Sequence, residues 1–73
     1  MSKLKRENFV RLAEARTNKI IDMLRLLGNL SNTSNYTYNS SDVDKIFDTL
    51  EKELKNARKK FDTIGIDDKF TLL

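Results

Sequence analysis

Apolar residues recur at alternating intervals of four and three positions in two stretches of the chain. We call the first series the first seam: Phe9, Ala13, Arg16, Ile20, Met23, Leu27 and Leu30. The second seam is Val43, Phe47, Leu50, Leu54, Ala57, Phe61 and Ile64. This spacing keeps one side of an α-helix against a neighbouring helix. The pattern therefore predicts two long helices, each of which must pack on something.

Local signals set the expected ends of these helices. Residues 6–27 contain no Gly or Pro, and Gly28 offers the left-handed conformation that commonly ends a helix. Residues 28–41 are rich in Asn, Ser and Thr, which favour turns and caps, so we expect a polar loop there. Ser41 is the expected N-cap of a helix over about 42–61. A C-terminal tail follows over 65–73, with Gly65 expected to end any longer helix.

The widths of the two apolar faces predict the architecture. At 100° per residue, helix 42–61 has an apolar arc of about 100°, which one neighbour can cover, whereas helix 6–27 has an arc of about 220°. We therefore expect an all-α, single-domain chain over 1–73, an antiparallel helical hairpin that dimerises into a four-helix bundle. Chains of this length rarely have a sufficient core of their own. The expected dimer or partner interface is Val10, Leu12, Ile21, Met23 and Leu26.

Two alternatives to this dimer remain open. The C-terminal tail, which carries Ile66, Phe70, Leu72 and Leu73, can cover the extra apolar stripe and give a monomer, extend as a docking peptide, or fray. The loop is also longer than most helix–helix connections, which permits a domain-swapped dimer with the same contacts.

Arg16 is the charged member of the first seam. Polar residues in such seams often fix helix register or oligomeric state. Arg16 has three possible roles: binding an anion, pairing with Glu53 or another carboxylate, or running its long stem along the apolar surface to reach water.

Composition argues against several classes of function. The chain has no Cys, so it has no disulfide and no thiolate zinc site, and it has no His, the commonest metal ligand. The close carboxylate pairs, Asp42 with Asp44 and Asp67 with Asp68, are explained by helix capping and solvation, and no nucleophile–base pair or phosphate-binding glycine loop is present. We therefore expect a non-enzymatic protein without cofactor, metal or small-molecule substrate. No apolar run of about 18 residues occurs and residues 1–6 lack an apolar signal core, so we expect a cytoplasmic protein without a membrane association.

Positive charge is unevenly distributed, although the net charge is only +3. Basic residues concentrate in the first half of helix 6–27 and the second half of helix 42–61, and an antiparallel hairpin brings them to the end away from the loop. Such a pole can bind nucleic acid through phosphate contacts. Complementarity to the helix dipole, together with ordinary solvation of a helix face, is the alternative explanation in helix 42–61. The candidate contacts are Lys5, Arg6, Arg11, Lys55, Arg58, Lys59 and Lys60.

Tyr36 and Tyr38 alternate with Thr37 in the loop, which places both rings on one side if the segment is extended. They are candidates for stacking on a base or on a partner's surface. The other interpretation is a lid on the end of the bundle over Leu30 and Phe47, with the hydroxyls toward water.

The chain also resembles a group of small, uncharacterised bacterial proteins associated with phages and other mobile elements. The resemblance covers about residues 6–61 and rests on four short runs: Arg11-Leu12-Ala13 with Arg16, residues 25–32, Tyr36-Thr37-Tyr38, and residues 42–47. It implies a bacterial, cytoplasmic, helical protein and transfers no site residues. Together with the residue patterns it favours a small interaction or regulatory protein that binds a protein partner as a homodimeric bundle. A nucleic-acid-binding accessory protein that uses the basic pole is the alternative.

Overall fold

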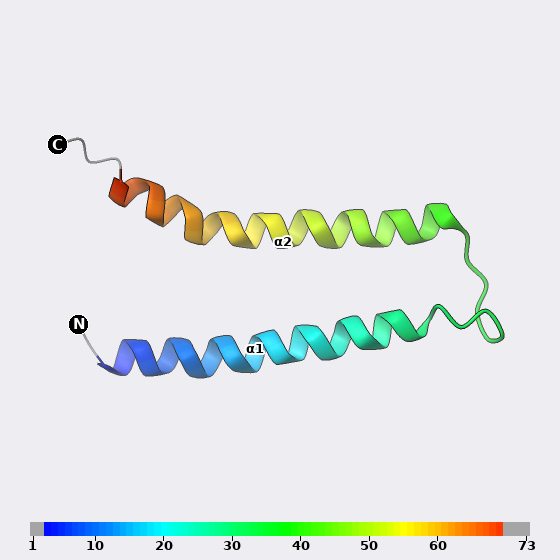
Figure 1. Cartoon of the computed structure of the whole chain (residues 1–73), viewed down its shortest axis with the longest axis horizontal. Helices are drawn as coiled ribbons and strands as arrows, with labels where there is room; N and C mark the ends of the chain where they lie inside the picture. Colours follow the sequence, from blue (N-terminus) through cyan, green and yellow to red (C-terminus); the bar gives the residue numbers. More distant parts are fainter. Residues whose placement is uncertain (1–2, 70–73) are drawn as a thin grey trace. The chain divides into compact units, whose positions relative to one another are not determined.

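Two long helices make up nearly all of the structure (Figure 1). The computed structural model describes the backbone of residues 3–69 and the side chains of residues 3–62. Helix α1 spans Lys3–Asn29 and helix α2 spans Ser40–Lys69, and no strand occurs in this part of the chain. The all-α fold class is therefore confirmed. The two helices belong to separate units, 1–37 and 38–73, and each is described by itself.

Helix α1 begins three residues before the predicted start and ends close to the predicted end. Near its end, two carbonyls accept hydrogen bonds from the residue three positions further along the chain. The Leu30 N–H donates to Leu27 O at 3.0 Å, and the Ser31 N–H donates to Gly28 O at 3.1 Å. Such short-range bonds satisfy carbonyls that would otherwise lack partners at a helix end. The prediction of a left-handed Gly28 was wrong, because no glycine or other residue in the described chain has a positive φ. The last turn of α1 is tightened by bonds between residues three apart, and no residue in it adopts the left-handed conformation.

The loop between the helices is organised by Asn32. Its backbone carbonyl accepts hydrogen bonds from the N–H groups of Asn35, at 3.1 Å, and Tyr36, at 3.0 Å. Its side-chain oxygen accepts a third bond, from the Ser34 N–H at 2.9 Å. An Asn side chain that bonds the backbone two residues onward imitates a turn. This segment thus forms turns, as its polar composition predicted.

The N-terminus of α2 is closed by a reciprocal cap. The Asp42 N–H donates to Asn39 Oδ1 at 2.8 Å, and the Asn39 N–H donates to Asp42 Oδ2 at 3.1 Å. The Val43 N–H donates to Asn39 O at 3.3 Å, the first bond of the helix. This arrangement is a capping box with an Asn–Asp pair. The predicted N-cap, Ser41, is wrong by two residues. Asn39 and Ser41 each have an acid three positions onward, Asp42 and Asp44, but the reciprocal bonds join Asn39 and Asp42.

Helix α2 also runs past its predicted end near residue 61 and passes through Gly65 to Lys69. A single helical glycine costs only about 1 kcal/mol relative to alanine, which an otherwise favourable helix tolerates. The predicted tail over 65–73 is thus helical in its backbone as far as Lys69. Its proposed packing or docking involves side chains that lie outside the described residues.

No described side chain is buried. Val10, Ala13, Leu27 and Val43 are half-buried, and the other described residues are exposed. Ile20 in the first seam is 60% exposed and Leu54 in the second is 72% exposed. Isoleucine and leucine are among the residues most often fully buried in folded proteins. The apolar faces of both helices are therefore largely exposed in the described part of the chain.

Candidate interaction surfaces

The apolar face of α1 is wide and has two distinct edges. At 100° per residue, Ile20 and Leu27 lie near its centre, and its total width is about 220°. The five residues predicted for the dimer interface all lie on α1, but not together. Leu12, Met23 and Leu26 lie toward one edge, whereas Val10 and Ile21 lie at the other. A single partner helix cannot contact both edges at once.

A second 4–3 series follows the edge that contains Val10 and Ile21; the sequence predicted that either this edge or the edge with Leu12 and Leu26 stays uncovered, but the series itself was missed. Its spacing is continuous across almost the whole helix, with one acid inside it. Its members are Val10, Glu14, Thr17, Ile21, Leu24 and Gly28. We call this series the edge stripe. The 4–3 spacing of the sequence was the signal that would have found it.

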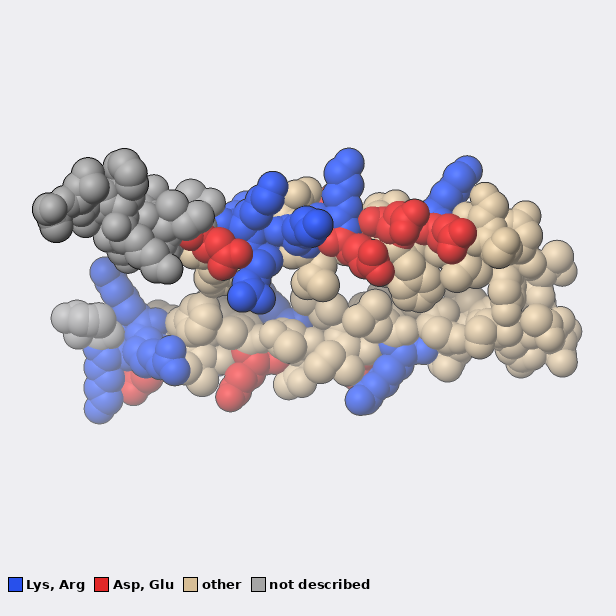
Figure 2. All heavy atoms as spheres, turned by 45° about the horizontal axis from the view of Figure 1, so that its top comes forward, with Lys and Arg blue, Asp and Glu red and all other residues tan. Residues whose placement is uncertain are grey.

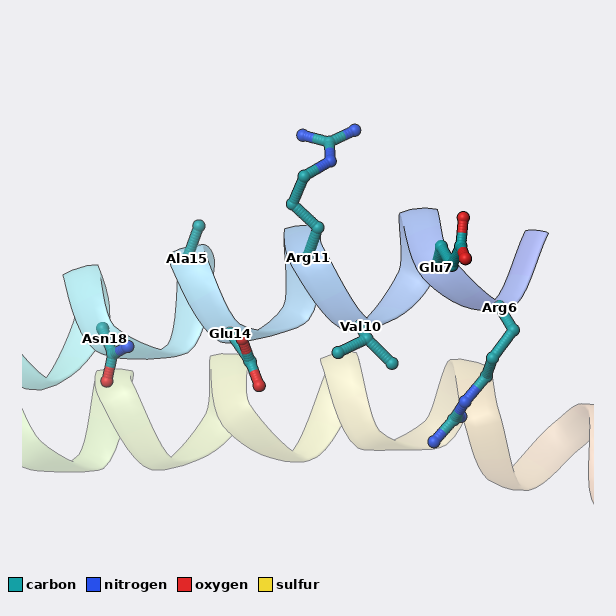
Figure 3. A pocket seen from close by; sticks show the side chains of 7 residues that line it. All are labelled: Arg6, Glu7, Val10, Arg11, Glu14, Ala15 and Asn18. Atoms are coloured by element: carbon teal, nitrogen blue, oxygen red, sulfur yellow. The ribbon is translucent and has the colours of Figure 1, made fainter. Parts of the chain in front are cut away.

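A shallow, open depression lies along the polar side of the edge stripe in the first half of α1. Its lining comes from α1: Arg6, Glu7, Val10, Arg11, Glu14, Ala15 and Asn18. In Figure 3, Val10, Glu14 and Asn18 point to one side of the helix, and Arg11 and Ala15 to another. Val10 is the half-buried apolar residue of this surface, with Glu14 one turn away. The depression is therefore a feature of a helix face and not an enclosed cavity.

The apolar face of α2 is narrow, as predicted, and is bordered by charge. Its exposed apolar members include Phe47, Leu50 and Leu54. Acids flank it in the first half of the helix, at Asp44, Glu51 and Glu53, and bases flank it in the second half, at Arg58 and Lys60. Apolar seams bordered by charged positions are typical of helices that pair with other helices.

Basic side chains gather in one half of each helix (Figure 2). On α1 the predicted contacts Lys5, Arg6 and Arg11 lie in the first three turns of the helix. The first turn of α1 contains no acidic residue. The Arg6 guanidinium carbon lies 5.9 Å from the centre of the Phe9 ring, and Arg11 Nη2 donates to Asn8 Oδ1 at 3.4 Å. Positive charge at this end opposes the helix dipole. The dipole therefore does not explain the basic residues of α1.

The dipole does not explain the basic residues of α2 either. Lys55, Arg58, Lys59 and Lys60 would lie at the negative end of a helix that stopped near 61, but α2 continues to Lys69. The effect of the dipole falls off within the last turn. Arg58 is partly accounted for by an ion pair with Asp62, with 3.4 Å between Nε and Oδ1, although both side chains are largely exposed. For the other three bases, which are exposed, solvation of the helix face remains as an explanation beside nucleic-acid binding.

The loop tyrosines Tyr36 and Tyr38 are 48% and 40% exposed, respectively. Their rings are thus half accessible, an exposure that both predicted roles, stacking and covering the end of a bundle, allow. Both roles stay predictions.

Neither helix has, within the described residues, a stretch long and apolar enough to cross a membrane. In the same part of the chain, no group of three or more acidic side chains is close enough together to hold a metal ion.

No protein-family model matches the chain, and no curated protein or solved structure matches it. The function is therefore inferred from the surfaces of the two helices.

Proposed function

We propose that this protein is a small, non-enzymatic interaction protein that works as a homodimeric helical bundle and binds a protein partner. One observation carries the proposal: within the described residues the members of both seams are exposed or at most half-buried, and no described side chain is buried. Burying apolar surface stabilises a fold by roughly 25 cal/mol per Å². A stable fold therefore needs other helices against these seams. The bacterial, cytoplasmic setting that the resemblance implies belongs to the same proposal.

A second copy is the cover that the residues favour. The face of α1 is about twice as wide as that of α2 by the 100° construction, so pairing α1 with α2 leaves one edge of α1 uncovered. Two such chains can cover each other's remaining edge in a four-helix bundle. Exchange of α2 between the copies would cover the same faces.

Thermal unfolding followed by circular dichroism tests the proposal. Because a dimer that folds on association gains stability by mass action, we expect Tm to rise as the protein is concentrated from about 1 to about 100 µM. The helical signal of a chain that folds alone would vanish at the same Tm at both concentrations, and this result would contradict the homodimer.

Nucleic-acid binding is the second candidate function. It is favoured by the basic clusters on α1 and α2, which their own helix dipoles do not explain. Phosphate contacts are the usual use of such clusters, and no base-specific recognition is implied.

Charge reversal tests this second candidate. We expect wild-type protein to bind a labelled duplex in fluorescence anisotropy, with an affinity that falls steeply between 50 and 200 mM salt. Combined Arg6→Glu, Lys59→Glu and Lys60→Glu substitutions should abolish binding. The control, Lys45→Glu with Lys52→Glu, reverses two bases in the acidic half of α2 and should leave binding largely intact. Equal loss in both variants, or no binding by the wild type, would count against a basic-cluster site.

A further inference from the structure

We propose that the second copy packs antiparallel on the edge stripe of α1. This inference rests on the proposed homodimer and goes further, because it chooses between the two edges of α1 and sets the direction of the partner helix. The packed residues are Val10, Thr17, Ile21, Leu24 and Gly28. From residue 10 to residue 28 the stripe runs about 27 Å along the helix.

The opposite edge of α1 is less suited to a helix partner. Leu12 and Leu26 lie on it, but Lys19 lies between them and Asp22 lies beside them at the next 4–3 position. Charged residues are depleted from the centres of protein interfaces. On the edge stripe the central positions are instead Thr17 and Ile21, and the one acid, Glu14, is nearer the N-terminal end.

Gly28 gives a second reason to choose the edge stripe. It lies in the last turn of α1 without a positive φ, and a Cβ added to it would meet nothing within 4 Å. A helical glycine costs roughly 1 kcal/mol relative to alanine, and neither the turn nor a close neighbour in this chain requires it. A glycine on a packing face lets another backbone approach closely. We infer that the partner helix comes nearest to α1 at this end of the stripe.

Charge sets the direction of the partner. In an antiparallel pair centred on residue 19, Val10 lies opposite the partner's Gly28, and Thr17 lies opposite the partner's Ile21. The same alignment places Glu14 beside the partner's Arg25, twice by symmetry. A parallel pair in register would place Glu14, which lies in the stripe itself, beside a second Glu14, which is repulsive.

Both side chains are available for this pair. Glu14 and Arg25 are exposed, and within the described residues neither side chain has a hydrogen bond or an ion pair. Glu14 lines the depression beside the half-buried Val10, so the depression can receive the partner's Leu24 and Arg25. Two bases line the depression itself: Arg11 donates to Asn8 Oδ1, and the Arg6 guanidinium lies over the Phe9 ring.

A charge-swap cycle on the full chain, read by sedimentation equilibrium, tests the proposal. Glu14→Arg alone and Arg25→Glu alone should each weaken the dimer roughly tenfold, because each creates two like-charged contacts across the interface. The double variant should recover the wild-type dissociation constant within about threefold. Asp22→Arg makes the same change in net charge as Glu14→Arg, but away from the stripe, and should alter the dissociation constant less than about threefold. Circular dichroism of each variant checks that helix content is retained.

The outcomes separate this inference from the proposed function. A dimer whose affinity recovers in the double variant supports the edge stripe. If the protein is a dimer but the double variant is no tighter than the single ones, the edge stripe is wrong and the homodimer stands. If the wild-type chain is a monomer, both are wrong.

Discussion

Ile20→Asp is expected to abolish both the dimer and most of the helical signal. Ile20 lies at the centre of the first seam and is 60% exposed in the chain. In a bundle this position faces another helix, so an aspartate would place a carboxylate in an apolar interior. We expect a loss of about 3–5 kcal/mol, which is comparable to the whole stability of a small domain. Circular dichroism at about 10 µM, where packing and not propensity maintains the helices, would show the loss.

Asn18→Asp is the matched control for this substitution. It introduces the same side chain two residues away, on the polar side of α1, and so carries the same small cost in helix propensity. We expect little change in Tm or mass. If Ile20→Asp behaves like Asn18→Asp, the first seam is not covered and the bundle is wrong.

Arg16→Leu is expected to have a large effect in the opposite direction. Arg16 interrupts an otherwise apolar seam, and a charge that is taken from water is costly even when it is paired. Leucine would make the seam continuous, so the guanidinium-chloride midpoint should rise, by the equivalent of about 1–3 kcal/mol. A polar residue in a seam often restricts register and oligomeric state, so we also expect Arg16→Leu to form additional oligomers.

Arg11→Leu separates this effect from the general gain of an apolar side chain. Arg11 lies on the polar side of α1 and bonds Asn8, so its replacement should not raise the midpoint. A lower midpoint for Arg16→Leu would mean that the guanidinium makes a required contact, and the interpretation of Arg16 as an anion-binding group would gain support.

The helices themselves were predictable because their signals are local. The 4–3 spacing and the absence of Gly and Pro predicted both helices, and α1 ends within two residues of the expected position. The Asn39 cap was missed because Asn39, Ser40 and Ser41 are all good N-cap residues, and both Asn39 and Ser41 have an acid three positions onward, at Asp42 and Asp44. The end of α2 was missed because one glycine costs too little to stop a helix.

The candidate sites were less predictable because they depend on what lies across from each helix. The apolar arc of α1 was evident in the sequence, but the expected interface residues were drawn from both of its edges. An apolar seam predicts that another apolar surface packs against it, but it does not identify the helix that provides this surface. The basic residues of α2 were similarly open to a dipole explanation until the helix was found to continue to Lys69.

The mass of the wild-type protein in solution tests the central claim, that a second copy covers the exposed apolar faces. The chain has a mass of 8.5 kDa. Sedimentation equilibrium at micromolar concentrations should give twice this value, with dissociation only on dilution. A folded, helical species at the mass of one chain throughout that range would contradict the account.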